Sequence, residues 1–378
     1  MISDLPGDLF EDILSRVPAI SLKRLRSSCK RWNRLFNNKE FARKHLHKAP
    51  KQSFFLTVTK DYYIYLMTIN HRGIRSIQSK GELSPIDCER IIISEVFHCD
   101  GLLLCTFDNK TRIMLWNSFT GQTSWGIQPF CTSHTYALGS YQESRYGNCS
   151  YKILSYKDDS VHEFAIYEIN SNSWRILDVV NSNSWWWILD VIPDFKLLYT
   201  CTYVSLKGKT YWFASDSKDE QLDMFLVSFD YTTERFGRLS LPFNCPSGFP
   251  RDATLSVVSE EKLAVLQHNN TWGKEIWVSN EIDGTNEVSW RKVLTVNDPK
   301  RDIWFTIARF LLNEEKKVAL CCETCIFNFN TTMKKLYVAG EDNIVNLMDY
   351  GETSTLGPII LDYVPSLVQI SRSVAKGK

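Results

Sequence analysis

The stretch "YVSLKGKTYWFA", residues 203–214, decides the fold of most of this chain. Two runs of apolar, β-branched and aromatic residues flank the dipeptide Lys207-Gly208, a pattern typical of a β-hairpin. The pattern returns at Glu260-Glu261 and at Glu314-Glu315, with a spacing of about 53 residues. Asp100-Gly101 opens a similar run, "GLLLCTF", about two such periods before Lys207. A repeat of this length predicts the four-stranded blades of a kelch-type β-propeller.

The chain as a whole divides into two parts whose residue patterns differ. Short β-branched and aromatic runs bounded by turn residues continue through residues 51–378, which predicts an all-β, propeller-like domain of about six blades. Residues 1–50 instead show helical periodicity. The predicted fold class is therefore a multidomain α+β protein, with a three-helix unit at 1–50 and the β domain at 51–378.

The helical unit has three predicted helices. Apolar residues recur at helical spacing over 9–17, and Pro18 ends this first segment. Ser21 is the expected cap of a second helix, whose apolar residues continue to Phe36 at intervals of three and four. A third is expected over "NKEFARKHLHK", residues 38–48. So small a unit has too little core to be stable alone, so its apolar stripe is expected to be shared with another chain.

Charge is distributed unevenly. Residues 1–51 contain twelve Lys or Arg and five Asp or Glu, a charge of +7, and the net charge of +1 leaves −6 for the remainder. Two units of opposite charge suggest different partners. The basic residues of 23–34 could neutralise phosphates, but the same segment carries an apolar face that needs a protein, so we expect no nucleic-acid partner.

The N-terminal residues and the apolar runs bear on location. The opening "MISDLPGDLFEDILSRV" lacks a basic leader and an uninterrupted apolar stretch, and no apolar run approaches the roughly 18 residues of a membrane helix. We therefore expect no membrane partner and a cytoplasmic or nuclear location.

No enzyme motif is complete. "KGKT" at Lys207 resembles the end of a phosphate loop, but Tyr203 stands where that loop requires glycine. Cys321, Cys322 and Cys325 could supply half of a zinc site, but no second pair lies nearby, so buried strand cysteines are the better interpretation. We expect a non-catalytic protein without catalytic, cofactor-binding or metal-binding residues, and without a cofactor.

The segment "LPGDLFEDILSRVPAISLKRLRSSCKRWNRLF", residues 5–36, resembles the F-box, with its Leu-Pro, Ile-Leu, Arg-x-Pro, Cys-Lys and Trp in the family order. In F-box proteins this unit binds an acidic Skp-type adaptor, which connects to a cullin scaffold and so to ubiquitin transfer. The resemblance implies adaptor-facing positions at Leu5, Pro6, Leu9, Ile13, Leu14, Val17, Pro18, Leu22, Leu25, Cys29 and Trp32.

The β domain also resembles a known family. Phrases such as "IMLWNSFTG", "FDYTTERFGRLSLP" and "YVPSLVQI" are similar to the F-box-associated, kelch-like interaction domain of a large plant family, although Ser118 replaces that family's usual proline. The resemblance implies a substrate-recognition subunit of an SCF-type ubiquitin ligase, which binds the Skp adaptor through the F-box and an unknown target through the β domain. The alternative is a propeller binding module outside a ligase, for example a glycan or glycoprotein reader.

A duplicated phrase occupies residues 170–192, where "NSNSWRILDVV" is followed by "NSNSWWWILDVI". The interval from Gly147 to Gly208 is 61 residues, against 46 from Gly101 to Gly147, so one blade is longer by about the length of the second copy. Either copy could fill the sheet while the other forms a Trp-rich loop. We interpret the copy as an insertion, with a target-binding loop at Trp185, Trp186 and Trp187 as the alternative.

Overall fold

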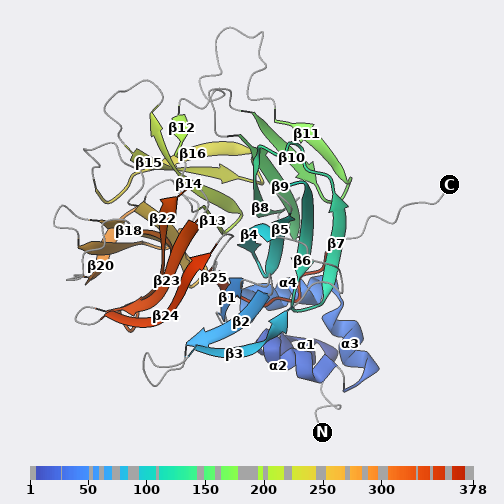
Figure 1. Ribbon diagram of the computed structural model, residues 1–378. Coiled ribbons are helices and arrows are strands. Elements are labelled where there is room, and N and C mark those ends of the chain that lie inside the picture. The colour runs from blue at the N-terminus through green and yellow to red at the C-terminus, as the bar shows by residue number, and fades with distance from the viewer. Residues whose placement is uncertain are drawn as a thin grey trace.

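The computed structural model describes residues 6–370, with gaps at 27, 51–53, 59–63, 70–76, 84–92, 108–109, 143–148, 158–162, 178–194, 199–202, 217–223, 244–252, 269–272, 283–287, 297–304, 329–330, 341–343 and 354–359. Within these residues four helices precede 25 strands, and Figure 1 shows the strands arranged as blades around a common centre. None of the described helices is long and apolar enough to cross a membrane.

The helices form a compact unit, here called the helical head. They are α1 (Gly7–Ser15), α2 (Ala19–Arg26), α3 (Lys30–Phe36) and α4 (Lys39–Lys48). The prediction of three helices is wrong, because the segment expected to form one helix is divided into α2 and α3. At the break the Ser28 amide closes a turn, and Cys29 is extended (φ −155°, ψ 154°). Serine side chains compete for backbone hydrogen bonds, which favours leaving a helix. Ser21 lies inside α2 and does not cap it, because Pro18 already accepts the Ser21 amide.

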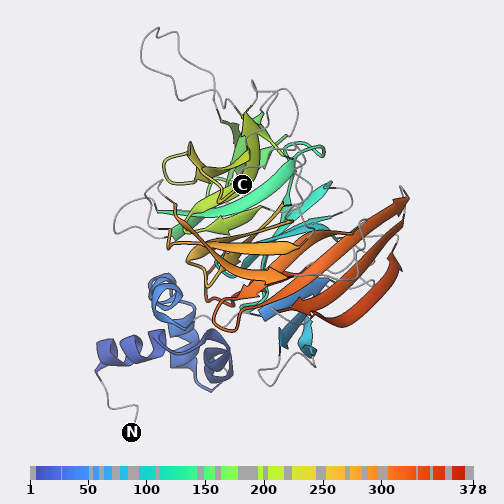
Figure 2. The ribbon, with the colours of Figure 1, turned by 90° about the vertical axis from the view of Figure 1, so that its left-hand side faces the viewer.

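The head has an aromatic core that it shares with the β domain. Phe10, Phe36 and Phe41 are buried within it, and the Phe36 and Phe41 ring centroids lie 5.7 Å apart. Phe119 and Leu367, both from the β domain, belong to the same cluster. The head is therefore packed onto the β domain, and Figure 2 shows it on one face of the ring.

The strands form six antiparallel sheets. The first three contain β25 (Leu361–Tyr363), β1 (Phe54–Val58), β2 (Ile64–Ile69) and β3 (Ile77–Leu83); β4 (Ile93–Cys99), β5 (Leu102–Phe107), β6 (Arg112–Asn117) and β7 (Gln122–Ile127); and β8 (Thr135–Gln142), β9 (Cys149–Tyr156), β10 (Phe164–Glu168) and β11 (Ser173–Ile176). The others contain β12 (Phe195–Leu197), β13 (Val204–Leu206), β14 (Lys209–Asp216), β15 (Met224–Asp230) and β16 (Arg235–Leu239); β17 (Ala253–Val258), β18 (Lys262–His268), β19 (Lys274–Ser279) and β20 (Trp290–Val296); and β21 (Phe305–Asn313), β22 (Val318–Asn328), β23 (Thr331–Ala339) and β24 (Ile344–Thr353). This arrangement confirms the predicted propeller architecture.

Tight turns join the first two strands of several blades at the predicted positions. Lys207 and Gly208 both have positive φ (49° and 75°), as do Asp100 and Gly101 (51° and 80°). Positive φ at both central residues defines the hairpin turn whose twist suits antiparallel strands. A side chain at Gly101 would also meet the Ser366 hydroxyl at 2.3 Å, so glycine is required there on two counts.

The ring is closed by residues from opposite ends of the chain. Strand β25 pairs with β1, in the register Phe54 to Tyr363 and Leu56 to Leu361. The blade that begins the propeller therefore takes its innermost strand from residues 361–363. Closure of this kind completes the four strands of the first blade, and a closed ring leaves only short, protected strand edges.

Residues 361–370, here called the closing segment, continue past β25 and are held by the blade of β4–β7. The buried Asn117 amide donates to the Ser366 and Val368 carbonyls, at 3.1 and 2.8 Å. The Ser118 hydroxyl lies 2.5 Å from the Tyr363 hydroxyl. Proline at position 118 could not make this bond, so the departure from the family's usual residue adds a polar contact to the closing segment.

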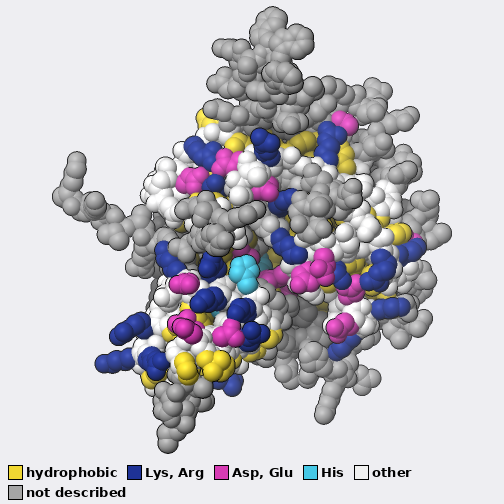
Figure 3. Space-filling model, turned by 180° about the vertical axis from the view of Figure 1, so that it is seen from behind, with side chains coloured by type: hydrophobic (Ala, Val, Ile, Leu, Met, Phe, Trp, Pro, Cys, Tyr) yellow, Lys and Arg dark blue, Asp and Glu magenta, His cyan; other side chains and the backbone are white. Residues whose placement is uncertain are grey.

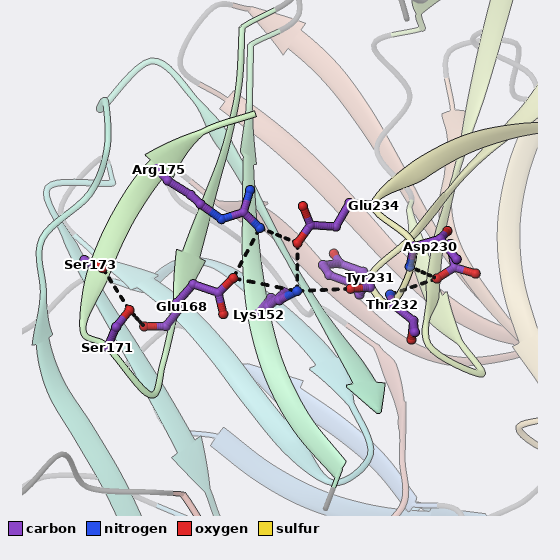
Figure 4. Close-up of polar contacts among 10 residues, drawn as sticks. Lys152, Glu168, Ser171, Ser173, Arg175, Asp230, Tyr231, Thr232 and Glu234 are labelled. Carbon is purple, nitrogen blue, oxygen red and sulfur yellow. Dashed lines mark hydrogen bonds and ion pairs between the residues drawn. The ribbon is translucent and has the colours of Figure 1, made fainter. Parts of the chain in front are cut away.

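Charged side chains connect neighbouring blades. Lys152 on β9 is only 6% exposed. Its Nζ lies 2.7 Å from the carboxylate of Glu234, a residue that follows β15 in the next blade. Arg175 on β11 donates to the same carboxylate and to Glu168. Figure 4 shows the four side chains converging, and we call this group the Glu234 clamp. A buried lysine is tolerated only when it is paired, so the clamp holds these two blades in register.

Candidate functional site

The outer side of α1 presents an apolar face. Leu9 and Ile13 are 49% and 46% exposed, and they lie on one side of the helix because they are four residues apart. Among the residues whose side chains the structure describes, only Ile176 on β11 is a comparably exposed large hydrophobic. Exposed apolar side chains that adjoin one another mark a surface suited to a partner.

The sequence-predicted adaptor positions divide into exposed and buried sets. Pro6 and Cys29 are exposed, as are Leu9 and Ile13, and Leu5 lies outside the described residues. Four positions are half-buried against the head's core: Val17, Pro18, Leu25 and Trp32. Leu14 and Leu22 are 7% and 0% exposed and belong to that core, so they shape the face from beneath and do not present a surface.

Basic residues surround the apolar face. Lys23, Arg24, Lys30, Arg31 and Arg34 are exposed, and Figure 3 shows dark blue side chains, with some magenta ones among them, around a yellow patch on the head. The face itself is held by α1–α4 contacts. For example, the Lys48 ammonium 2.6 Å from Asp12, together with Arg16, lowers the pKa of that carboxyl. An apolar centre with a basic rim suits an acidic protein partner.

The centre of the propeller contains a cavity of about 580 Å³ on the face that carries the head. Each blade contributes its innermost strand, and α4 contributes Leu46 and His47. Phe97 and Tyr203 stack within it, with ring centroids 4.8 Å apart. The cavity therefore has a wall built by both domains of the chain.

The structure describes only part of the duplicated phrase. Its first copy supplies the turn after β10 and the strand β11, and its second copy, with Trp185, Trp186 and Trp187, lies outside the described residues. Trp174 of the first copy donates to the Gln128 carbonyl at 2.7 Å and packs on Tyr167, with ring centroids 5.2 Å apart. This tryptophan is a structural residue that ties its blade to the preceding one.

A second Ser-Trp-Arg sequence performs the same task and was missed by the sequence analysis. Trp290 on β20 donates to the Ser240 carbonyl of the preceding blade at 2.8 Å. Arg291 reaches the Glu314 carboxylate of the following blade, which also accepts from Lys262 at 3.1 Å. The repeat of "SWR" at 173–175 and 289–291 was the available signal.

The motifs tested for catalysis occupy structural positions. Lys207–Thr210 form the turn and start of the β13–β14 hairpin, as expected. Cys321 and Cys322 are buried on β22, as expected for strand cysteines, whereas the side chain of Cys325 is not described. Within the described part of the chain, no three His, Cys, Asp or Glu side chains gather in a way that could hold a metal ion.

Comparisons with known proteins agree with this architecture. The F-box associated beta propeller domain family matches residues 55–370, and the F-box domain family matches residues 2–44. A probable F-box protein of Arabidopsis thaliana is 49% identical over 383 residues, which cover 99% of this chain and 88% of the relative. A putative F-box protein of the same plant is 46% identical over 379 residues, 98% of each chain. An F-box/kelch-repeat protein, also from this plant, is 41% identical over 401 residues, 100% of this chain and 99% of the relative. The chain therefore belongs to the family of F-box proteins that carry an F-box associated β-propeller domain.

Proposed function

We propose that this protein is a non-catalytic substrate-recognition subunit of an SCF-type ubiquitin ligase, acting in the cytoplasm or nucleus. The head binds a Skp-type adaptor, and through it the cullin scaffold. The propeller holds a target protein near the ubiquitin-charged partner, so transfer is accelerated by proximity. Membership of the F-box family supports the general role.

The exposure of Leu9 and Ile13 is the observation that carries the adaptor assignment. Burying the exposed half of each side chain contributes about 1 kcal/mol, since complete burial of such a side chain is worth about 1.5–3 kcal/mol. Association itself costs about 4 kcal/mol or more, so two residues are insufficient. Pro6 and the half-buried Trp32 must contribute, and the basic rim increases the rate of encounter with an acidic adaptor.

The test is co-purification of the intact chain with its adaptor from plant cells. Leu9→Asp with Ile13→Asp places two charges in the apolar face, and we expect loss of both adaptor and cullin. Ile176→Asp is the matched control, because it charges an exposed hydrophobic residue of the propeller. It should leave capture unchanged, and both variants should melt as the wild type does. Recovery of neither adaptor nor cullin with the wild type would refute the proposal, as would full capture by the double variant.

A further inference from the structure

The central cavity has the size of a binding site, and no residue of the apolar face on α1 lines it. Its volume of about 580 Å³ lies within the roughly 300–1,000 Å³ of typical ligand pockets. All six innermost strands line it, through residues such as Cys99, Tyr141, Ser205, Ser256, Phe310 and Leu361. A wall made from six blades is rigid, which favours a preformed site.

The interior combines an aromatic wall with small polar groups. The Phe97 and Tyr203 rings stack on one another, and Tyr203 continues this cluster towards Trp212, with ring centroids 6.4 Å apart. Ser140, Ser205 and Ser256 add hydroxyls to the lining. Such a wall accepts an apolar stem and its hydrogen-bonding groups, and aromatic faces also attract cations.

The lining of the cavity carries more acidic than basic side chains. Asp100, Glu260 and Glu261 stand at hairpin tips and Asp362 on β25, whereas the lining contains two permanent cations, Lys207 and Arg309. The net charge of these six side chains is −2. The Lys207 Nζ donates to the Ile282 carbonyl at 3.0 Å, and the Tyr151 hydroxyl donates to the Asp100 carboxylate at 3.3 Å.

The buried thiol of Cys99 lies in the electrostatic field of these carboxylates. Burial raises its pKa, and the Asp100 and Glu260 carboxylates raise that pKa further. Two carboxylates from different blades therefore act on one point of the cavity wall. A positive charge placed there would be stabilised.

We propose that this cavity binds a Lys or Arg side chain from an extended basic segment of the target protein. The aliphatic stem lies along Phe97 and Tyr203, and the cationic group meets the carboxylates of Asp100, Glu260 and Glu261. The assignment rests on the proposed role as a target receptor and names the chemistry of the target. Because Leu46 and His47 of α4 form part of the wall, a bound segment lies beside the head.

The experiment measures binding of a fluorescent peptide to the intact chain by anisotropy, at about 0.15 M salt where weak surface attraction is screened. The probe is a nine-residue Gly-Ser-flanked peptide with alternating Leu and Lys or Arg, and its counterpart carries Glu in place of the basic residues. We expect saturable binding of the basic peptide alone. Glu260→Gln with Glu261→Gln should weaken it about tenfold, as expected for the loss of two partly exposed ion pairs.

Two further variants distinguish binding in the cavity from attraction to general surface charge. Gln142→Trp places a large ring on an exposed lining residue and should weaken binding without any change of charge. Glu315→Gln removes a carboxylate from an exposed turn outside the cavity and should leave the affinity unchanged. Equal binding of the acidic peptide, or full affinity in both cavity variants, would overturn the inference. Adaptor capture is measured separately on the same variants and should be normal, so failure here is distinct from failure of the ligase assignment.

Discussion

Replacing Glu234 by glutamine should destabilise the propeller by about 2 kcal/mol. In this variant Lys152 would keep its ion pair with Glu168, in which Nζ lies 3.7 Å from a carboxylate oxygen. It would also keep its hydrogen bond to the Tyr231 carbonyl, at 3.3 Å. Removing one partner of a fully buried ion pair costs about 3–5 kcal/mol. The cost here is smaller because Glu168 still compensates the lysine and the Glu234 side chain is 22% exposed.

Thermal unfolding of the intact chain measures this loss. An unfolding entropy of about 2.1 cal/mol/K per residue gives about 0.8 kcal/mol/K for 378 residues. The expected fall in Tm is therefore about 2–3 °C. In a Lys152→Met background no buried ammonium remains, so the added Glu234→Gln change should cost about 0.5 kcal/mol or less. An equal fall in both backgrounds would refute the coupling, and Glu315→Gln on an exposed turn serves as the control.

The same variant has a predicted pH signature. Burial raises the pKa of the Glu234 carboxyl, but hydrogen bonds from Lys152 and Arg175 outweigh it and lower the pKa from its ordinary value of 4.5. A carboxyl whose pKa is lowered by folding stabilises the folded state above its unfolded pKa, and this contribution is lost as pH falls through the folded-state pKa. The Tm difference between wild type and Glu234→Gln should therefore be constant near neutral pH and shrink below pH 4.5.

Two further predictions concern the closing segment and the duplicated phrase. Asn117→Asp keeps an acceptor for the Phe119 amide but loses both donated bonds to the closing segment and buries a charge, so we expect a loss of about 3 kcal/mol. Limited proteolysis should then cleave residues 361–370 faster, and unchanged protection would contradict the role of Asn117. Deleting residues 181–192 should leave the Tm within about 1 °C and the β-sheet circular dichroism unchanged, because β10 precedes the phrase and the first copy already supplies β11. Loss of that signal would show that the second copy is structural.

The hairpins were predictable because their turn chemistry is local. Lys207-Gly208 and Asp100-Gly101 specify their turns within two residues, and the strands on either side follow from β-branched and aromatic composition. The break between α2 and α3 was not predictable by periodicity, because the apolar spacing runs through Ser28 and Cys29 without interruption. The break is a local change of backbone conformation, since Cys29 is extended there.

The apolar character of the candidate site was predictable from the sequence, but which of its residues are exposed was not. The sequence marks Leu9, Leu14 and Leu22 alike as apolar, yet Leu9 is exposed and the other two are buried. Part of the burial comes from Phe119 and Leu367, which lie far along the chain. The partners of Arg175 and Arg291 sit on neighbouring blades, so their roles also depended on the closed ring.

The position of the closing segment has a consequence for synthesis on the ribosome. Leu367 belongs to the head's core and β25 completes the blade of β1, so neither domain can finish packing until residues 361–370 have emerged. A nascent or truncated chain would thus expose Phe10 and Phe119 together with an open blade, surfaces that chaperones and proteases recognise. The core of the head is therefore completed only after residues of the last propeller strand have been synthesised.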